Sequence, residues 1–151
     1  MITTDINLIK QQLEQGEVVG IPTETVYGLA ANIYNEEAIA TIFSTKKRPH
    51  TNPLIVHVHS MQQAKELVSH FPPKAEQLAA HFWPGPLTLI LPKSPLISDS
   101  ITANQSTVAI RIPNHPTTLQ LLETLDFPIA APSANPYNRI SPTRALSLIH
   151  I

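Results

Sequence analysis

Prolines divide this chain into short apolar runs, and this division limits the folds it can adopt. Five runs of three to six residues are rich in Val, Ile and Leu, and each has a proline beside it: residues 18–21, 54–58, 87–91, 107–112 and 129–131. Runs of this length are typical of buried strands, and proline interrupts a strand because it lacks the N–H donor. The sequence therefore predicts several short strands joined by stiff connections.

Segments with helical spacing of apolar residues lie between these runs. Helices are expected around positions 6–13, 38–43, 64–68, 75–82 and 118–125, and residues 92–106 are expected to form a loop. The first helix has a cap at Thr4 or Asp5 and ends at Gly16. Because strands and helices alternate, the predicted fold class is α/β or α+β, with a sheet covered by helices.

The composition excludes several kinds of protein. The chain has 151 residues, 42% of them hydrophobic, with a net charge of -1 and no cysteine. These values argue against a disordered chain and a bulk polyanion binder, and they exclude disulfides and a Cys nucleophile. With no signal-peptide pattern and no apolar stretch of about 20 residues, a soluble cytoplasmic protein is expected.

A cationic loop precedes the second apolar run. Residues 46–48 are Lys-Lys-Arg, followed by Pro49 and by Asn52-Pro53. Ammonium and guanidinium groups are the usual protein ligands of phosphate, whereas a solvated cationic helix end is the alternative. The prolines favour the anion-binding interpretation because they restrict the path of the loop.

Three polar clusters lie at strand ends and are expected to form one site. They follow Ile21, precede Leu54 and follow Ala131. In α/β sheets, ligands collect outside strand ends. Hydroxyl and amide groups in these clusters (Thr23, Thr25, Ser133 and Asn135) can bind a polar ligand, or can cap ordinary turns.

Two further side chains within strands are candidates. Arg111 can pair with a carboxylate in a cleft or face solvent, with neither interpretation preferred. His57 can be a base, a ligand or a hydrogen-bonded core residue, and the core role is the most frequent for such a histidine. No P-loop, Gly-x-Gly-x-x-Gly, Gly-x-Ser-x-Gly or metal-binding histidine pattern is present.

Six motifs occur in one order along the chain. They are Pro-Thr-Glu-Thr-Val-Tyr-Gly (22–28), Lys-x-Arg-Pro (46–49), Asn-Pro-Leu-Ile-Val-His (52–57), Trp-Pro-Gly-Pro-Leu-Thr (83–88), Val-Ala-Ile-Arg (108–111) and Ala-Pro-Ser-Ala-Asn (131–135). In this order they resemble the Sua5/YrdC/YciO family, and the first motif resembles its Sua5 branch. The resemblance implies a YrdC/RibB-like (DHBP synthase-like) fold, a twisted mixed sheet flanked by helices around a basic cavity.

The resemblance also implies an activity. Members of this family join L-threonine, bicarbonate or CO2, and ATP into L-threonylcarbamoyladenylate, a nucleotidyltransferase reaction that releases pyrophosphate. The implied substrates are therefore ATP, with Mg2+, and L-threonine. The product supplies the N6-threonylcarbamoyl group of adenosine 37 in tRNA through downstream transfer proteins, and a contact with tRNA or double-stranded RNA is possible.

Site residues follow from the resemblance, position by position. Lys46 and Arg48 are expected to be catalytic and to hold the phosphates of ATP, with Asn52, Thr107, Ser133, Asn135 and Ser141 as further ATP contacts. L-threonine is expected to contact Thr25, His57, Arg111 and the main chain of Ala131. One position departs from the pattern, because the family often has a small residue where Lys47 stands.

Two other functions are weighed against this one. An RNA-binding YrdC-like module suits a cationic surface, but the near-neutral charge and the lack of interleaved aromatic and basic residues count against it. A carbamoyltransferase-type maturation domain would be accompanied by zinc-finger cysteines and an acylphosphatase unit, and neither is visible.

The end of the chain carries a second expectation. Residues 146–151, Leu-Ser-Leu-Ile-His-Ile, match a translated reading frame of a common sequencing adapter. Residues 1–145 are therefore predicted to be a YrdC-like domain that is incomplete at its C-terminus, and residues 146–151 to be a non-native tail. A Sua5 protein would continue into a linker and a second domain.

Overall fold

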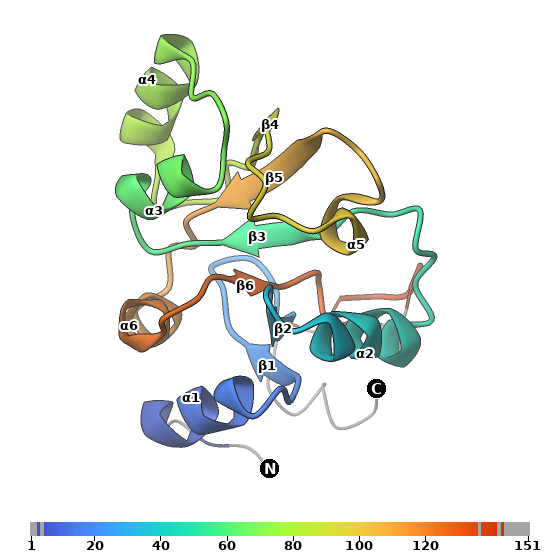
Figure 1. Cartoon of the computed structure of the whole chain (residues 1–151). Helices are drawn as coiled ribbons and strands as arrows, with labels where there is room; N and C mark the ends of the chain where they lie inside the picture. The colour runs from blue at the N-terminus through green and yellow to red at the C-terminus, as the bar shows by residue number, and fades with distance from the viewer. Residues whose placement is uncertain (1–2, 4, 136, 142, 144–151) are drawn as a thin grey trace.

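A mixed sheet forms the centre of the molecule (Figure 1). The computed structural model describes residues 3, 5–135, 137–141 and 143. Its six strands lie in the order β1-β2-β6-β3-β5-β4. Only β3 and β5 pair in parallel, and the other neighbours are antiparallel. The strands are β1 Val19–Ile21, β2 Gly28–Asn32, β3 Ile55–His57, β4 Leu89–Pro92, β5 Thr107–Arg111 and β6 Ile129–Ala130.

Six helices accompany the strands in the described part of the chain. They are α1 Ile6–Glu14, α2 Glu36–Lys46, α3 Met61–Glu66, α4 Pro73–Phe82, α5 Asp99–Thr102 and α6 Pro116–Thr124. Side chains cap three of them, since Asp5 accepts from Asn7 and Leu8, Asn35 accepts from Ala38, and Ser60 accepts from Gln63. Such caps satisfy N–H groups that have no partner within the helix. None of the described helices is both long and apolar enough to cross a membrane.

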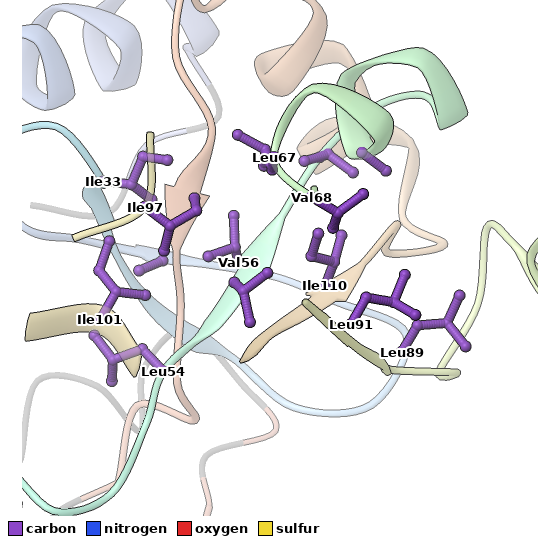
Figure 2. Close-up of a cluster of buried hydrophobic side chains, with 14 of the residues drawn as sticks. Ile33, Leu54, Val56, Leu67, Val68, Leu89, Leu91, Ile97, Ile101 and Ile110 are labelled. Atoms are coloured by element: carbon purple, nitrogen blue, oxygen red, sulfur yellow. The ribbon is translucent and has the colours of Figure 1, made fainter. Parts of the chain in front are cut away.

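One face of the sheet is packed by α2, α3, α4 and α5. Val56 of β3 and Ile110 of β5 are fully buried there, in a cluster that includes Leu67 and Ile101 (Figure 2). Burying an aliphatic side chain of this size contributes about 1.5–3 kcal/mol. This cluster is the main hydrophobic core and fixes which face of β3 and β5 points inward.

Among the described residues, helices cover only half of the opposite face. Helices α1 and α6 pack against it over β1, β2 and β6, through Leu13, Leu121 and Leu122, and lie together at the lower left of Figure 1. Over β3, β5 and β4 the same face carries Ile55, Thr107 and Ala109, which are half-buried, and Ile90, which is 68% exposed. We call these four residues the open face.

Most predicted elements are confirmed, with ends shifted by one to three residues. The fold class is also confirmed as a mixed sheet flanked by helices, whereas the basic cavity stays a prediction. Strand β2 was not predicted, because Gly-Leu-Ala-Ala-Asn has low strand propensity and is held by pairing with β1 and β6. The predicted loop 92–106 is partly wrong, since it contains the short helix α5.

The predicted end of the domain lies outside the described residues. The boundary at residue 145 and the tail 146–151 are therefore not tested by the structure, and both remain predictions.

The backbone at Lys47 explains why a small residue suits this position. Lys47 caps the C-terminus of α2 with φ +53°, the left-handed region. A Cβ atom in that region costs about 1–2 kcal/mol, and glycine avoids the cost.

Replacing Lys47 with glycine should therefore stabilise the fold. We expect Lys47→Gly to raise the free energy of unfolding by about 1 kcal/mol, because the strain is relieved at the helix end. In a domain of this size the melting temperature should rise by about 3 °C, measured by calorimetry or circular dichroism.

Lys10 gives the matched control because it lies inside α1. Lys10→Gly should lower the free energy of unfolding by about 1 kcal/mol, since glycine is unfavourable in a helix interior. A Lys47→Gly variant as unstable as Lys10→Gly would contradict the role assigned to the left-handed cap.

Candidate active site

The three polar clusters converge because β6 runs antiparallel to β3. The carboxyl end of β6 therefore lies beside the amino end of β3, and both lie near the start of β2. Main-chain hydrogen bonds join the clusters directly: Leu29 N–H donates to Pro132 O and Ala134 N–H to Tyr27 O, each at 2.8 Å. The prediction that the three clusters converge is confirmed, although the cluster before Leu54 lies at the amino end of its strand and not at a carboxyl end. That they form one ligand site stays a prediction.

Glycine is required where two of these clusters touch. Gly28 forms an isolated bridge with Ser133. A Cβ atom at Gly28 would lie 3.2 Å from Ala131 Cβ and 3.4 Å from the Pro132 carbonyl oxygen. The glycine that ends the first motif therefore permits the loop after β1 to approach the loop after β6.

Lys46 is buried at the centre of this junction. Its side chain lies at the end of α2 and is 1% exposed, and its ammonium group donates to the carbonyl oxygens of Ser133 and Asn135. Tyr137 N–H donates back to the Lys46 carbonyl at 2.8 Å. The solvated-helix-end interpretation is thus wrong for Lys46, which ties α2 to Ser133, Asn135 and Tyr137.

The charge of Lys46 depends on pH near neutrality. Burial, with a smaller contribution from the nearby Arg48, lowers the pKa of Lys46 from 10.5 to about 8. The side chain is still largely protonated at pH 7. An ammonium group that is poorly hydrated and beside a second cation gains from an approaching anion.

Arg48 and Asn52 lie in the loop that follows Lys46. Arg48 donates to the main-chain oxygens of Asn52, at 3.4 Å, and Pro53, at 2.9 Å. These bonds use two of the five N–H groups of a guanidinium. Burial lowers the pKa of Arg48, but arginine stays protonated at neutral pH.

Tyr137 connects this loop to the segment after β6. Asn52 Nδ2 donates to the Tyr137 hydroxyl at 2.8 Å. Asn135 donates to the Arg139 carbonyl at 2.8 Å and accepts from the Ser141 hydroxyl at 3.2 Å. Four residues expected to contact ATP, Lys46, Asn52, Asn135 and Ser141, therefore belong to one hydrogen-bonded network that also includes Tyr137.

The opposite end of β3 carries His57 beside Arg111 of β5. The two residues are register partners in the parallel pair, so their side chains share a face of the sheet. His57 is 2% exposed, and its Nδ1 lies 3.3 Å from the Ile55 carbonyl oxygen. Burial lowers the pKa of His57 from 6.5 to about 4, so the imidazole is neutral at pH 7.

Arg111 is buried and paired with an acidic side chain. Its guanidinium forms an ion pair with Glu24, and its Nε donates to the Gly85 carbonyl at 3.0 Å. The second carboxylate oxygen of Glu24 accepts from Asn114 N–H. The solvent-facing interpretation of Arg111 is therefore wrong, and pairing with a carboxylate is confirmed within the chain itself.

Thr25 follows Glu24 in the loop between β1 and β2. The Thr23 hydroxyl donates to Val26 O at 2.7 Å and accepts from Thr25 N–H at 3.2 Å. The two threonine hydroxyls lie 3.0 Å apart. Thr23 thus has the turn role that the sequence allowed, while Thr25 remains exposed next to the Glu24–Arg111 pair.

The structure also places two further expected site residues, Thr107 and Ala131. Thr107 lies at the start of β5, on the open face but at the opposite end of the strand from Arg111. Ala131 is buried, and its N–H donates to Ile55 O at 3.0 Å, which leaves its carbonyl as the main-chain group for a ligand. No expected ligand contact of either residue is tested by the structure.

Sequence reasoning assigned no role to two residues that the structure brings into the site. Glu24 pairs with Arg111, and Tyr137 bonds to both Asn52 and Lys46. Glu24 could have been noticed as the one charged residue between positions 18 and 35. Nothing in the sequence distinguishes Tyr137 from the other tyrosines.

A known family model matches nearly the whole chain. The Sua5/YciO/YrdC family model, whose description is "Telomere recombination", matches residues 11–150. The chain belongs to the Sua5/YciO/YrdC family. The six ordered motifs therefore identified the family correctly.

Named relatives within the family are similar over most of this chain. A threonylcarbamoyl-AMP synthase of Pyrococcus abyssi is 50% identical over 133 residues, which cover 88% of this chain and 39% of the relative. One of Bacillus subtilis is 50% identical over 139 residues, covering 91% and 40%. The chain spans about two-fifths of the length of these relatives.

A solved structure has the same arrangement of elements. The crystal structure of P. abyssi Sua5 complexed with L-threonine superimposes with a TM-score of 0.94 at 46% identity. It covers 99% of this chain, which corresponds to 44% of that protein. The family fold is therefore present throughout the described residues.

The buried His57 should make stability depend on acid. In the folded chain His57 gains a proton only near pH 4, whereas in the unfolded chain it does so near its ordinary pKa of 6.5. The unfolded state therefore binds more protons between these values, and stability is lost as pH falls from about 6.5 to 4. The gap corresponds to about 3 kcal/mol.

Denaturant unfolding at a series of pH values measures this loss. His57→Gln should remove about 3 kcal/mol of the decrease between pH 7 and pH 4, whereas the exposed His70→Gln should retain the full decrease. The assignment is refuted by a His57→Gln variant whose stability falls as steeply as that of the wild type.

Proposed function

We propose that this chain carries the catalytic domain of an L-threonylcarbamoyladenylate synthase, a nucleotidyltransferase of tRNA modification. One observation carries the proposal: a cationic junction and an Arg–His pair lie at opposite ends of one strand, β3. The likeness to a structure complexed with L-threonine supports it. The matched relatives are much longer than this chain, so its activity and substrates are part of the proposal.

The cationic end suits the triphosphate of ATP. Lys46 and Arg48 supply two positive charges, and Ser133, Asn135 and Asn52 surround them with polar groups. Charge-assisted hydrogen bonds to phosphate are stronger than neutral ones. Since Lys46 already holds two carbonyls, it acts on phosphate by its charge and by positioning residues 133–135, while Arg48 has further N–H donors to offer.

The other end suits an α-amino acid. Arg111 is a guanidinium in a buried setting, where it can pair with the carboxylate of L-threonine. His57 beside it is neutral, so it acts as a hydrogen-bonding group and not as a second charge. Thr25 and the Ala131 carbonyl complete the proposed contacts with threonine.

The spacing between the two ends suits the reaction. Strand β3 has three residues and is therefore about 10 Å long. The amine of threonine attacks CO2, forms an N–C bond and loses a proton. A carbamate oxygen then attacks the α-phosphorus of ATP, the bond to the β,γ-phosphates breaks, and pyrophosphate leaves with the electron pair. Catalysis rests on orientation and charge stabilisation, with no covalent enzyme intermediate.

The proposal includes Mg2+ and tRNA, but it assigns no residue of the chain to either. Within the described ranges, no three His, Asp or Glu side chains come together as a metal site. Any Mg2+ would therefore be held mainly by the phosphates of ATP, and we assign no step to it. The product would supply tRNA threonylcarbamoylation in the cytoplasm, through separate transfer proteins, and direct contact with tRNA stays a prediction.

Pyrophosphate release tests the activity. Purified protein should release pyrophosphate from ATP only when L-threonine and bicarbonate are both present, because the carbamate is the nucleophile. Release should stop when either is omitted. Turnover of ATP that does not depend on threonine would refute the proposal, and salt-sensitive tRNA binding without turnover would favour the RNA-binding alternative.

Arg48 offers a sharper test of the phosphate end. Arg48→Ala should raise the KM for ATP at least about tenfold, since charge-assisted hydrogen bonds contribute about 1.5–3 kcal/mol. Arg48→Lys should recover only part of the loss because it keeps the charge but not the planar fork. Lys74→Ala, an exposed change on α4, is the control. Equal KM values for the three variants would contradict a phosphate role of Arg48.

A further inference from the structure

The ion pair between Glu24 and Arg111 places a carboxylate of the chain on the guanidinium that is proposed to bind the substrate. Arg111 comes from the end of β5, and Glu24 comes from the loop between β1 and β2. The two residues are 87 positions apart in the sequence. The Nε of this guanidinium donates to the Gly85 carbonyl and one terminal nitrogen pairs with Glu24, so an amino-acid carboxylate that binds Arg111 lies beside the Glu24 carboxylate.

Both partners are shielded but reachable. The Arg111 side chain is 10% exposed and that of Glu24 is 21% exposed. Arg111 is held from behind by the Gly85 carbonyl, and Glu24 by Asn114 N–H. The pair is therefore anchored on both sides, and a ligand that inserts between the two side chains must satisfy a guanidinium and a carboxylate together.

A zwitterion has that property and a simple carboxylate does not. Inserting an α-amino acid replaces one ion pair with two, carboxylate to Arg111 and ammonium to Glu24, and every charge keeps a partner. A monoanion would instead place a second negative charge beside Glu24 and compete for its one cation, leaving the Asn114 N–H as the other contact of the Glu24 carboxylate. Two carboxylates beside a single guanidinium in a partly shielded place repel each other. The neutral His57 cannot offset this repulsion.

We propose that Glu24 is a specificity-determining residue that binds the α-ammonium group of the amino-acid substrate, while Arg111 binds its carboxylate. The Glu24–Arg111 pair thereby selects amino acids over carboxylates that lack an amino group. This inference rests on the proposed function, because it assigns the threonine end of the same site.

A purely structural role is the competing explanation. In that role Glu24 only ties the loop between β1 and β2 to the end of β5. Its removal would then loosen the site and weaken all ligands of Arg111 by similar factors. The two explanations differ in how they treat a ligand that has the carboxylate but not the amine.

The test compares L-threonine with 3-hydroxybutanoate, which is threonine without its amino group. Dissociation constants are measured by calorimetry for the wild-type chain, Glu24→Gln, Glu24→Asp and the control Glu123→Gln, an exposed change on α6. Thermal unfolding of each variant is recorded alongside, and Glu24→Asp keeps the charge if Glu24→Gln folds poorly.

The wild type and Glu123→Gln should bind threonine at least about tenfold more tightly than 3-hydroxybutanoate, a difference of about 1.4 kcal/mol. Glu24→Gln should weaken threonine at least about tenfold and leave 3-hydroxybutanoate unchanged or tighter. Glu24→Asp should retain part of the discrimination.

Two results would overturn the inference in distinguishable ways. If Glu24→Gln weakens both ligands by the same factor, or neither, Glu24 does not read the ammonium group although the proposed function stands. If the wild-type chain binds no threonine, the proposed function fails at its amino-acid end and the role of Glu24 falls with it.

Discussion

The buried ammonium group of Lys46 holds the candidate site together. It joins the end of α2 to two carbonyl oxygens that lie 87 and 89 residues further along the chain. Its removal would leave both oxygens without these hydrogen bonds, which costs about 1–3 kcal/mol for each buried polar group. This side chain holds Ser133 and Asn135, and the main-chain carbonyl of the same residue holds Tyr137. Lys46 therefore has a structural role through its hydrogen bonds and an electrostatic role through its positive charge.

The sheet provides the second constraint through its unequal faces. One face is closed by four helices around Val56 and Ile110. The other is covered by the described helices only over β1, β2 and β6, and over β3, β5 and β4 it carries the open face of Ile55, Thr107, Ala109 and Ile90. The proposed site residues of β3 and β5 lie on this less covered face. Because the helices of the main core pack on one face of the sheet, the proposed site residues of β3 and β5 can occupy the other face.

Charge pairing distinguishes the two ends of the site. At the end proposed to bind the nucleotide, Lys46 and Arg48 donate to main-chain carbonyls, which carry no formal charge, so two cations remain for phosphate. At the end proposed to bind the amino acid, Arg111 is already neutralised by Glu24. The first arrangement favours a polyanion, whereas the second favours a zwitterion. These preferences match the two substrates of the proposed reaction.

Local patterns were sufficient to predict most elements and the family of this chain. Periodicity placed five strands and five helices, and the ordered motifs named the candidate site residues, because both are properties of neighbouring positions. Strand β2 was not predicted because its alanines have low strand propensity and form a strand only by pairing with β1 and β6. Three properties could be known only from the folded chain: the burial of Lys46, the neutrality of His57 and the pairing of Glu24 with Arg111. Each depends on which distant segments meet, and the order and pairing of the strands in the sheet decide that.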